Sequence, residues 1–271
     1  MRTHFNAYIL DYLLYNQNMK TLWLFLCCLL LGLPALAEND HVRIAQQNAP
    51  AVVTINAIKK DGSTFTGTGF VLTSDGLIAT SRHVSQDTLF MNITFNNGAV
   101  SGEAVTAAEA GNVDLSLLRI HARNLPTVKV ASSAHVMPGQ SITVIGNPRR
   151  LQNTVTSGLI SQVRQKSDGV IWHQISAPIS PSSSGSPVFN ENGEVISVAF
   201  ASYPGENNQN LNFSIPSDYL INLVQAAGFQ LPNAGTDAVI TIATPTKQEN
   251  AFAAHVKKSW SILKRILHIN S

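Results

Sequence analysis

The sequence has few charged residues and only two cysteines. Charged residues make up 13% of the 271 positions, about half of the usual ~25%, and the formal net charge is +2. The main body therefore lacks the basic patch of a nucleic-acid-binding protein, and no nucleic-acid partner is expected. Cys27 and Cys28 both lie near the N-terminus, so a chain cleaved after them would have no disulfide and no cysteine-based zinc site. The sequence shows no other cluster that would hold a metal, and no cofactor is expected.

The N-terminal segment is typical of a secretory signal peptide. Lys20 precedes an apolar run from Leu22 to Leu31, and the triplet Ala35-Leu36-Ala37 forms a small-x-small cleavage site. The run is too short for a membrane-spanning helix, which needs ~20 residues. We therefore predict that residues 1–37 are an upstream extension with a signal peptide, and that the mature protein is exported, either to a bacterial periplasm or out of the cell.

Residues 41–230 form one continuous β-rich stretch. Short apolar runs recur between turn pairs such as Asp75-Gly76 and Asn97-Gly98, and such a pattern predicts strands joined by hairpins. Many short strands favour antiparallel barrels or a sandwich over an α/β fold, and the length suits two small barrels. The expected strands are Val52–Ile58, Gly69–Leu72, Leu77–Thr80, Leu89–Phe95, Leu115–Ile120, Ile142–Ile145, Thr154–Val163, Val170–Ile175 and Val195–Ala201.

Helices are expected only after these strands. Ser217 is a good N-cap for the first helix, and Gly228 ends it. Residues 231–247 are expected to be a linker, and residues 248–268 a basic amphipathic helix with an apolar stripe that includes Trp260. That helix either packs on the barrels or on a neighbouring subunit, or it lies on an anionic membrane surface.

Three segments carry residues suited to acyl transfer. His83 ends the apolar hairpin TGTGFVLTSDGLIATSRHV, and Asp114 opens the apolar strand VDLSLLRI. A buried carboxylate there needs a partner, such as a histidine N–H. Ser184 lies in SSSGSPV, a turn whose backbone amides could form an oxyanion hole. Taken singly, each has a plainer explanation, namely a structural histidine, a solvated strand end and a flexible serine-rich loop.

Taken together, these blocks resemble the trypsin-like serine peptidases, most closely the bacterial HtrA/Deg type. The resemblance covers residues 41–225 and includes VIGNPRRLQNTVTSGLIS and LNFSIPSD in the matching order. It implies an all-β protease domain at 38–230, with two packed antiparallel six-stranded barrels that meet near 125–140 and a cleft between them.

The resemblance also implies the roles of individual residues. His83 would be the general base, Asp114 would fix its tautomer, and Ser184 would be the nucleophile that attacks a peptide carbonyl. The backbone N–H groups of Ser182 and Ser184 would form the oxyanion hole. Polypeptides would be the substrates, and the enzyme would act in protein quality control.

The sequence departs from the family in two places. Ser182 stands where the family has glycine, and Ser186 replaces a second glycine after the nucleophile. If Ser182 adopts φ > 0, the strain would be ~1–3 kcal/mol. HtrA proteins also carry PDZ domains after the protease, and the residues after 230 are too few for one. The alternative is therefore a catalytically weak or inactive binding module tethered by its C-terminal helix.

The specificity pocket follows from the same resemblance. Its lining would consist of Pro178, Ile179, Val198, Ala199, Phe200 and Asn212. No acid stands there to bind Arg or Lys, and Asn212 occupies a position where the family usually has glycine. A larger residue at that position narrows the pocket, so cleavage after small aliphatic residues such as Ala or Val is expected.

Overall fold

The structure is a computed structural model that describes residues 15, 19, 40–147, 153–202 and 211–232, without the side chains of 201 and 202. The predicted signal peptide, most of the linker and the amphipathic tail lie outside these residues. Asp40 begins the compact unit that contains the described body. In the parts of the chain that are described, no helix combines the length and the apolar character needed to cross a bilayer.

The first half of the body folds into an antiparallel seven-stranded sheet with the order β5-β4-β1-β2-β3-β7-β6. Its strands are β1 (Val52–Lys59), β2 (Thr64–Val71), β3 (Leu77–Thr80), β4 (Thr88–Thr94), β5 (Val100–Glu103), β6 (Val105–Glu109) and β7 (Ser116–Arg119). The Asp75-Gly76 pair makes the β2–β3 turn, where Gly76 has φ 105° and lies against the Ile120 carbonyl. A side chain would not fit at that approach, which explains the glycine.

The second half folds into a sheet that closes on itself. Its strands are β8 (Lys129–Val130), β9 (Ser141–Gly146), β10 (Thr154–Gln165), β11 (Ile171–Ile175), β12 (Pro187–Phe189), β13 (Glu194–Ser202) and β14 (Asn212–Pro216). Because β12 pairs with both β9 and β13, six antiparallel strands form a closed barrel, and β8 joins β13 in parallel. The predicted all-β, two-barrel fold class is confirmed, although the first sheet remains open between β5 and β6 in the described residues.

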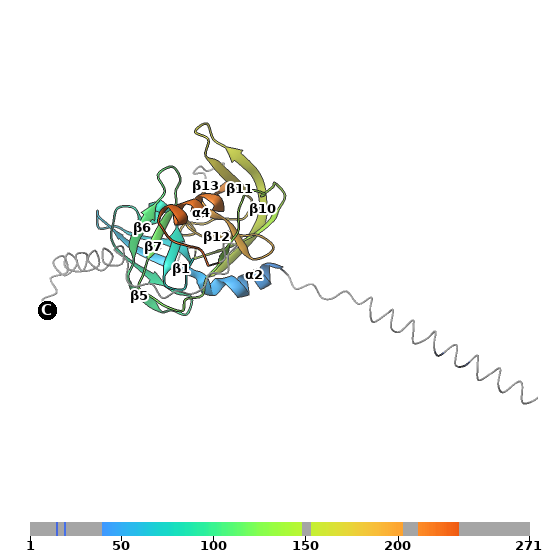
Figure 1. The fold of residues 1–271 in the computed structure, drawn as a ribbon, viewed down its shortest axis with the longest axis horizontal. Coiled ribbons are helices and arrows are strands. Elements are labelled where there is room, and N and C mark those ends of the chain that lie inside the picture. Colours follow the sequence, from blue (N-terminus) through green and yellow to red (C-terminus); the bar gives the residue numbers. More distant parts are fainter. Residues whose placement is uncertain (1–14, 16–18, 20–39, 148–152, 203–210, 233–271) are drawn as a thin grey trace, which may run out of the picture. The chain divides into compact units, whose positions relative to one another are not determined.

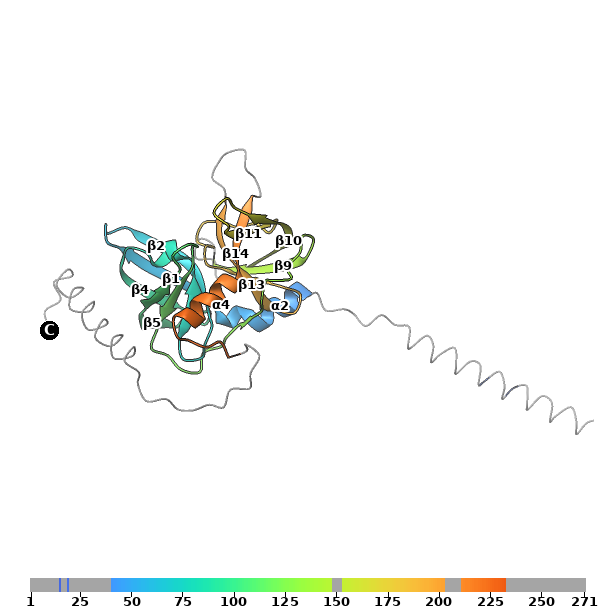
Figure 2. The same ribbon diagram turned by 45° about the horizontal axis from the view of Figure 1, so that its top comes forward.

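Two longer helices lie where the sheets meet, α2 (Asp40–Asn48) and α4 (Ser217–Ala226), as both ribbon views show (Figures 1 and 2). A 3₁₀ turn, η1 (Ala49–Ala51), leads from α2 into β1. The prediction of Ser217 as N-cap is wrong by one residue. Pro216 is the N-cap, and the Ser217 hydroxyl donates to the Ala131 carbonyl instead.

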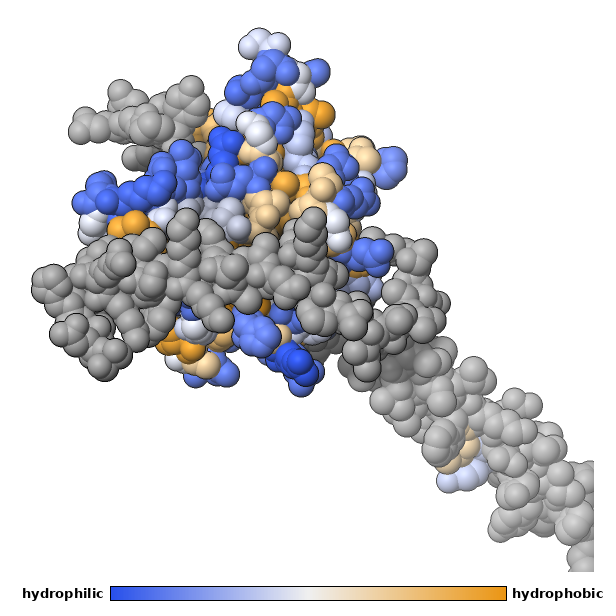
Figure 3. All heavy atoms as spheres, turned by 60° about the vertical axis from the view of Figure 1, so that its left-hand side comes forward, coloured by the Kyte–Doolittle hydropathy of each residue, from blue (hydrophilic) through white to orange (hydrophobic). Residues whose placement is uncertain are grey.

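A shared apolar core joins the two sheets. It contains Ile55 and Leu117 from the first sheet and Val198 and Ile215 from the second, all of them buried. A smaller apolar cluster fills the interior of the second barrel. Burying one such aliphatic side chain contributes ~1.5–3 kcal/mol, so the common core fixes one sheet against the other. On the face seen in Figure 3, the described surface is mostly hydrophilic, with hydrophobic residues in small separate patches.

Candidate active site

His83 and Asp114 meet at one end of the paired strands β3 and β7. His83 lies on α3 (Arg82–Ser85), a single helical turn that follows β3, and Asp114 lies just before β7. One carboxylate oxygen of Asp114 lies 2.6 Å from His83 Nδ1, and the other accepts the His83 backbone N–H at 2.9 Å. A carboxylate accepts hydrogen bonds, so the contact suits an Nδ1–H tautomer, and in the neutral imidazole Nε2 then offers its lone pair. The His83 side chain is 39% exposed and that of Asp114 21%, so solvent or a ligand can reach the ring.

Neighbouring contacts fix the turn that carries His83. The Arg82 guanidinium donates to the Ala110 carbonyl at 2.7 Å, and the Ser85 hydroxyl donates to that of Ser116 at 2.9 Å. The ring of Phe65 meets the His83 imidazole edge to face, with centroids 5.9 Å apart. These contacts link α3 to the segment before β7, to β7 itself and to β2.

Ser184 lies in the second of two consecutive β-turns. In the first, the Ser183 N–H donates to the Ser180 carbonyl at 3.0 Å, and Ser182 has φ 72°. That pattern is a type II turn, with Pro181 at the position where proline is favoured and Ser182 where glycine is usual. The left-handed conformation considered for Ser182 is therefore present in the structure.

The second turn contains Ser184 itself. The Ser186 N–H donates to the Ser183 carbonyl at 3.0 Å, and Gly185 has φ 88°. A Cβ atom on Gly185 would collide with the Thr68 carbonyl oxygen, so both the backbone angle and the close approach require glycine here. This turn presents Ser184 at its first central position.

Thr68 on β2 fastens the Ser184 turn to the first sheet. Its backbone N–H donates to the Ser184 carbonyl at 2.9 Å, and its hydroxyl donates to the Ser182 carbonyl at 2.8 Å. The same hydroxyl accepts the Asn147 N–H at 3.0 Å. Thr68 falls within the TGTGF block of the sequence, but nothing in that block indicated this contact.

The Ser184 hydroxyl donates to the Phe200 carbonyl at 3.2 Å. The structure thus pairs His83 with Asp114, whereas no hydrogen bond joins Ser184 to His83 in the described residues. Within the same residues, the backbone N–H groups of Ser182 and Ser184 have no hydrogen-bond acceptor. Both amides are therefore available to a ligand.

The predicted pocket residues do not all face the same side. Ile179 and Ala199 pack in the core of the second barrel, and the Asn212 amide donates to the Ala177 carbonyl at 2.8 Å beside them. Val198 is buried in the core shared by both sheets. Pro178 is exposed, and its carbonyl accepts the Thr156 hydroxyl at 3.1 Å.

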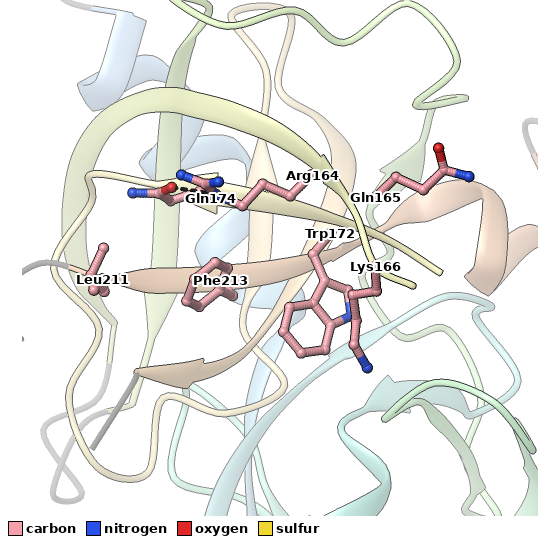
Figure 4. A pocket seen from close by; sticks show the side chains of 7 residues that line it. All are labelled: Arg164, Gln165, Lys166, Trp172, Gln174, Leu211 and Phe213. Atoms are coloured by element: carbon pink, nitrogen blue, oxygen red, sulfur yellow. Dashed lines mark hydrogen bonds between the residues drawn. The ribbon is translucent and has the colours of Figure 1, made fainter. Parts of the chain in front are cut away.

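Phe200 belongs to an aromatic cluster under a surface hollow. Its ring lies 5.0 Å from that of Trp172, which in turn lies 5.6 Å from Phe213. The hollow has a volume of about 440 Å³ and is lined by Arg164, Gln165, Lys166, Trp172, Gln174, Leu211 and Phe213 (Figure 4). Lys166 reaches over the Trp172 ring at 4.6 Å. The cluster supports the strand whose carbonyl holds Ser184.

No group of three or more His, Cys, Asp or Glu side chains that could hold a metal ion occurs in the described ranges. The candidate site is formed by side-chain and backbone groups around His83, Asp114 and Ser184. It contains an oriented imidazole, a hydroxyl on a tightly held turn, and two amides without acceptors. Such a set is suited to nucleophilic attack on an acyl carbon.

Comparison with known proteins finds peptidase relatives. Residues 67–198 match the family described as "Trypsin-like peptidase domain". The putative serine protease HhoB of Synechocystis is 34% identical over 194 residues, which cover 68% of this chain and 46% of that protein. The mitochondrial serine protease HTRA2 of Bos taurus is 32% identical over 201 residues, which cover 69% and 43%.

Solved structures show the same fold. The serine endoprotease from Yersinia pestis aligns with a TM-score of 0.62 and 27% identity, covering 70% of this chain and 67% of that one. The HtrA-type protease AlgW with a tripeptide aligns with a TM-score of 0.63 and 24% identity, covering 69% and 62%.

The fold and the family match together define the class of this protein. The chain carries a trypsin-like serine peptidase domain. Within that class, the proteins to which the domain is similar include HTRA2 and the HtrA-type protease AlgW. The chain spans less than half of the length of these curated relatives.

Proposed function

We propose that this domain is a serine endopeptidase that works through an acyl-enzyme intermediate. The observation that carries the proposal is the double contact of Asp114 with His83, at 2.9 and 2.6 Å, because it fixes both the position and the tautomer of the imidazole. A histidine held in this way is prepared to accept a proton at Nε2. The tightly held turn that presents Ser184 supplies the matching hydroxyl.

The proposed reaction begins when the Ser184 hydroxyl leaves the Phe200 carbonyl and turns toward His83. That exchange of one hydrogen bond for another costs at most ~1 kcal/mol. His83 takes the hydroxyl proton as Oγ attacks the peptide carbonyl, and the imidazolium is stabilised by Asp114. The backbone N–H groups of Ser182 and Ser184 donate hydrogen bonds to the developing oxyanion. His83 then protonates the leaving amine, and water hydrolyses the acyl-enzyme by the same steps in reverse.

A second candidate, a weakly active or inactive binding module, is favoured by two observations. The Ser184 hydroxyl is directed to Phe200, and Ser182 holds φ 72° without being glycine. A non-glycine residue in that conformation stores ~1–3 kcal/mol of strain. If the turn has to keep φ > 0 at Ser182 in order to bind an oxyanion, this strain opposes oxyanion binding. The two candidates predict different reactivity of Ser184.

A serine-directed fluorophosphonate probe separates the two candidates. The wild-type protein should be labelled and should cleave peptides. Ser184→Ala should lose labelling and should lower turnover on the order of a million-fold. Ser183→Ala is the matched control, since it removes the neighbouring hydroxyl and should retain labelling. An unlabelled wild-type protein would favour the binding module, and labelling that survives in Ser184→Ala would assign the nucleophile to another residue.

The substrate is proposed to be a polypeptide, cleaved after small aliphatic residues. Similar solved structures contain a tripeptide and a decapeptide, which supports peptide binding in this fold. Ile179 and Ala199 pack in the apolar core of the second barrel, where the Asn212 amide donates to the Ala177 carbonyl. A pocket bordered by these residues would favour a small apolar side chain. Cleavage-site profiling with a peptide library tests this, and a preference for Arg, Lys or Phe would contradict it.

Export is proposed as well, with a role in protein quality control. The support is the signal-like segment of the sequence and the name of a relative in Chlamydia pneumoniae, a probable periplasmic DegP-like serine endoprotease that is 35% identical over 156 residues. N-terminal sequencing of the protein from a bacterial periplasmic fraction should find Glu38 as the first residue. An intact N-terminus in the cytoplasmic fraction would contradict export.

A further inference from the structure

Lys59 lies at the end of β1, next to the turn that carries His83. Its ammonium group donates to three backbone carbonyls, those of His83 at 2.9 Å, Val84 at 3.1 Å and Gln86 at 2.6 Å. An ammonium has three N–H donors, so all of them are committed to this turn. Lys59 thus connects β1 directly to the backbone of His83.

These bonds complete the hydrogen bonding of α3. A helix leaves its last four carbonyls without partners inside the helix, and α3 is only one turn long. The Arg82 carbonyl accepts the Gln86 N–H at 2.8 Å, and the Ser85 carbonyl accepts the Thr88 hydroxyl at 2.8 Å. The remaining carbonyls, those of residues 83, 84 and 86, depend on Lys59 alone among the described residues. A cation at this end also complements the helix dipole.

Phe65 connects the same lysine to the imidazole ring. The Lys59 ammonium lies 5.3 Å from the centre of the Phe65 ring, within the range of a cation–π contact. The His83 ring meets Phe65 at an interplanar angle of 88°. Lys59 therefore acts on both the backbone and, through Phe65, the side chain of His83.

We propose that Lys59 is a positioning residue for His83, a role that rests on the proposed peptidase function. Its three hydrogen bonds hold α3 in place, so that Nδ1 stays aligned with Asp114 and Nε2 stays available to accept a proton. Lysine suits this role because one nitrogen reaches three converging carbonyls, which the planar guanidinium of arginine cannot do.

The other charged side chains near α3 have partners of their own. Burial lowers the pKa of Lys59, with Asp87 and Asp61 acting in the opposite direction. Arg82 points to the Ala110 carbonyl, Glu109 accepts the Ser85 hydroxyl, and Lys60 pairs with Asp87 at 3.4 Å. Apart from Asp114, no other side chain with a charge bonds to the backbone of residues 83–86 in the described residues.

Lys59→Met tests the proposal because it keeps the length of the side chain and removes its donors. In the full-length protein, kcat should fall ~10–100-fold while KM changes less than about twofold, the pattern of a misplaced catalytic group. Lys60→Met is the matched control, since this adjacent exposed lysine pairs with Asp87, outside α3, and its loss should leave both constants unchanged. Lys59→Arg should behave like Lys59→Met rather than like the wild type.

A second measurement does not depend on hydrolysis. The proton in the 2.6 Å His83–Asp114 hydrogen bond should give a separate low-field resonance in proton NMR. Lys59→Met should shift or broaden that resonance, whereas Lys60→Met should not. If wild-type protein fails to cleave peptides, the proposed function is refuted, but the resonance still tests Lys59. An unchanged resonance and an unchanged kcat in folded Lys59→Met, even with a lower Tm, would overturn the positioning role. If Lys59→Met does not fold, the same two measurements on Lys59→Arg decide.

Discussion

His173 is a buried histidine that the proposed chemistry does not use. It lies on β11 and is 1% exposed, and its Nδ1 has no hydrogen-bond partner among the described residues. Burial lowers its pKa to about 4, and Asp218 acts in the opposite direction. The folded protein therefore holds His173 in its neutral form. We predict that acidification destabilises the protein through this one side chain.

The sign and the size follow from proton binding. The unfolded chain takes up a proton near the ordinary pKa of 6.5, whereas the folded protein resists it until about 4. Between these values the unfolded state binds more protons, so the free energy of unfolding decreases as pH falls. Each pH unit between the two pKa values is worth ~1.4 kcal/mol, so the total loss from His173 is about 3 kcal/mol. Above the ordinary pKa and below the folded one, the contribution stays constant.

Urea unfolding from pH 8 to pH 3 measures this effect. Both proteins should carry Ser184→Ala, so that self-cleavage does not interfere, and one should also carry His173→Leu. Every other titrating group is common to the pair, so the difference between their free energies of unfolding isolates His173. That difference should change by about 3 kcal/mol across the acidic range, in favour of His173→Leu at low pH. A difference that does not vary with pH would refute the buried neutral histidine, whatever its value at neutral pH.

Four further predictions concern the turn, the pocket and the tail. Ser182→Gly relieves φ 72° and should raise kcat, with ~10²–10³ as the ceiling for one oxyanion donor; steady-state kinetics without a gain would mean that serine is accepted without strain. Ser186→Ala removes a buried hydroxyl with no partner in the described part of the chain, so urea unfolding should show a gain of about 1 kcal/mol, and a clear loss would contradict this. Asn212→Gly should widen the specificity pocket, so that cleavage profiling finds larger residues before the cleaved bond. An unchanged profile would mean that Asn212 does not line the pocket. Residues 248–268 should make the protein float with anionic liposomes at low salt, since each basic residue near such a surface contributes ~1 kcal/mol. Protein that stays in the soluble fraction would favour packing instead, provided that truncation after Lys247 destabilises the protein or dissociates an oligomer.

Strands were the most predictable part of the fold. The expected strand Leu77–Thr80 coincides with β3, and Thr154–Val163 lies within β10. Each is an apolar or alternating run bounded by a turn signal such as Asp75-Gly76, so local sequence was sufficient. β12 (Pro187–Phe189) was not predicted, because three residues beside a turn carry no period. Its place comes from closing the second barrel between β9 and β13.

The helix α2 was missed for a different reason. Its sequence, DHVRIAQQN, is mostly polar, and Ile44 is its one buried hydrophobic side chain. Distant contacts hold it in place, since His41 Nδ1 lies 2.7 Å from the Thr143 hydroxyl and Arg43 donates to the Glu191 carbonyl at 2.6 Å. Neither contact leaves a helical period in the sequence. The helix is therefore set by tertiary packing, which overrides weak propensity.

The site shows the same division between local chemistry and long-range placement. Sequence motifs were enough to select His83, Asp114 and Ser184 as candidates, because each function needs a particular side chain. The contacts that place them are made largely by backbone groups, which every residue possesses. The Thr68 hydroxyl donates to the Ser182 carbonyl, 114 positions away in the sequence, and the Phe200 carbonyl accepts the Ser184 hydroxyl. A carbonyl leaves no mark in the identity of its residue, so the spacing of the two sheets at the site could be learned only from the folded chain.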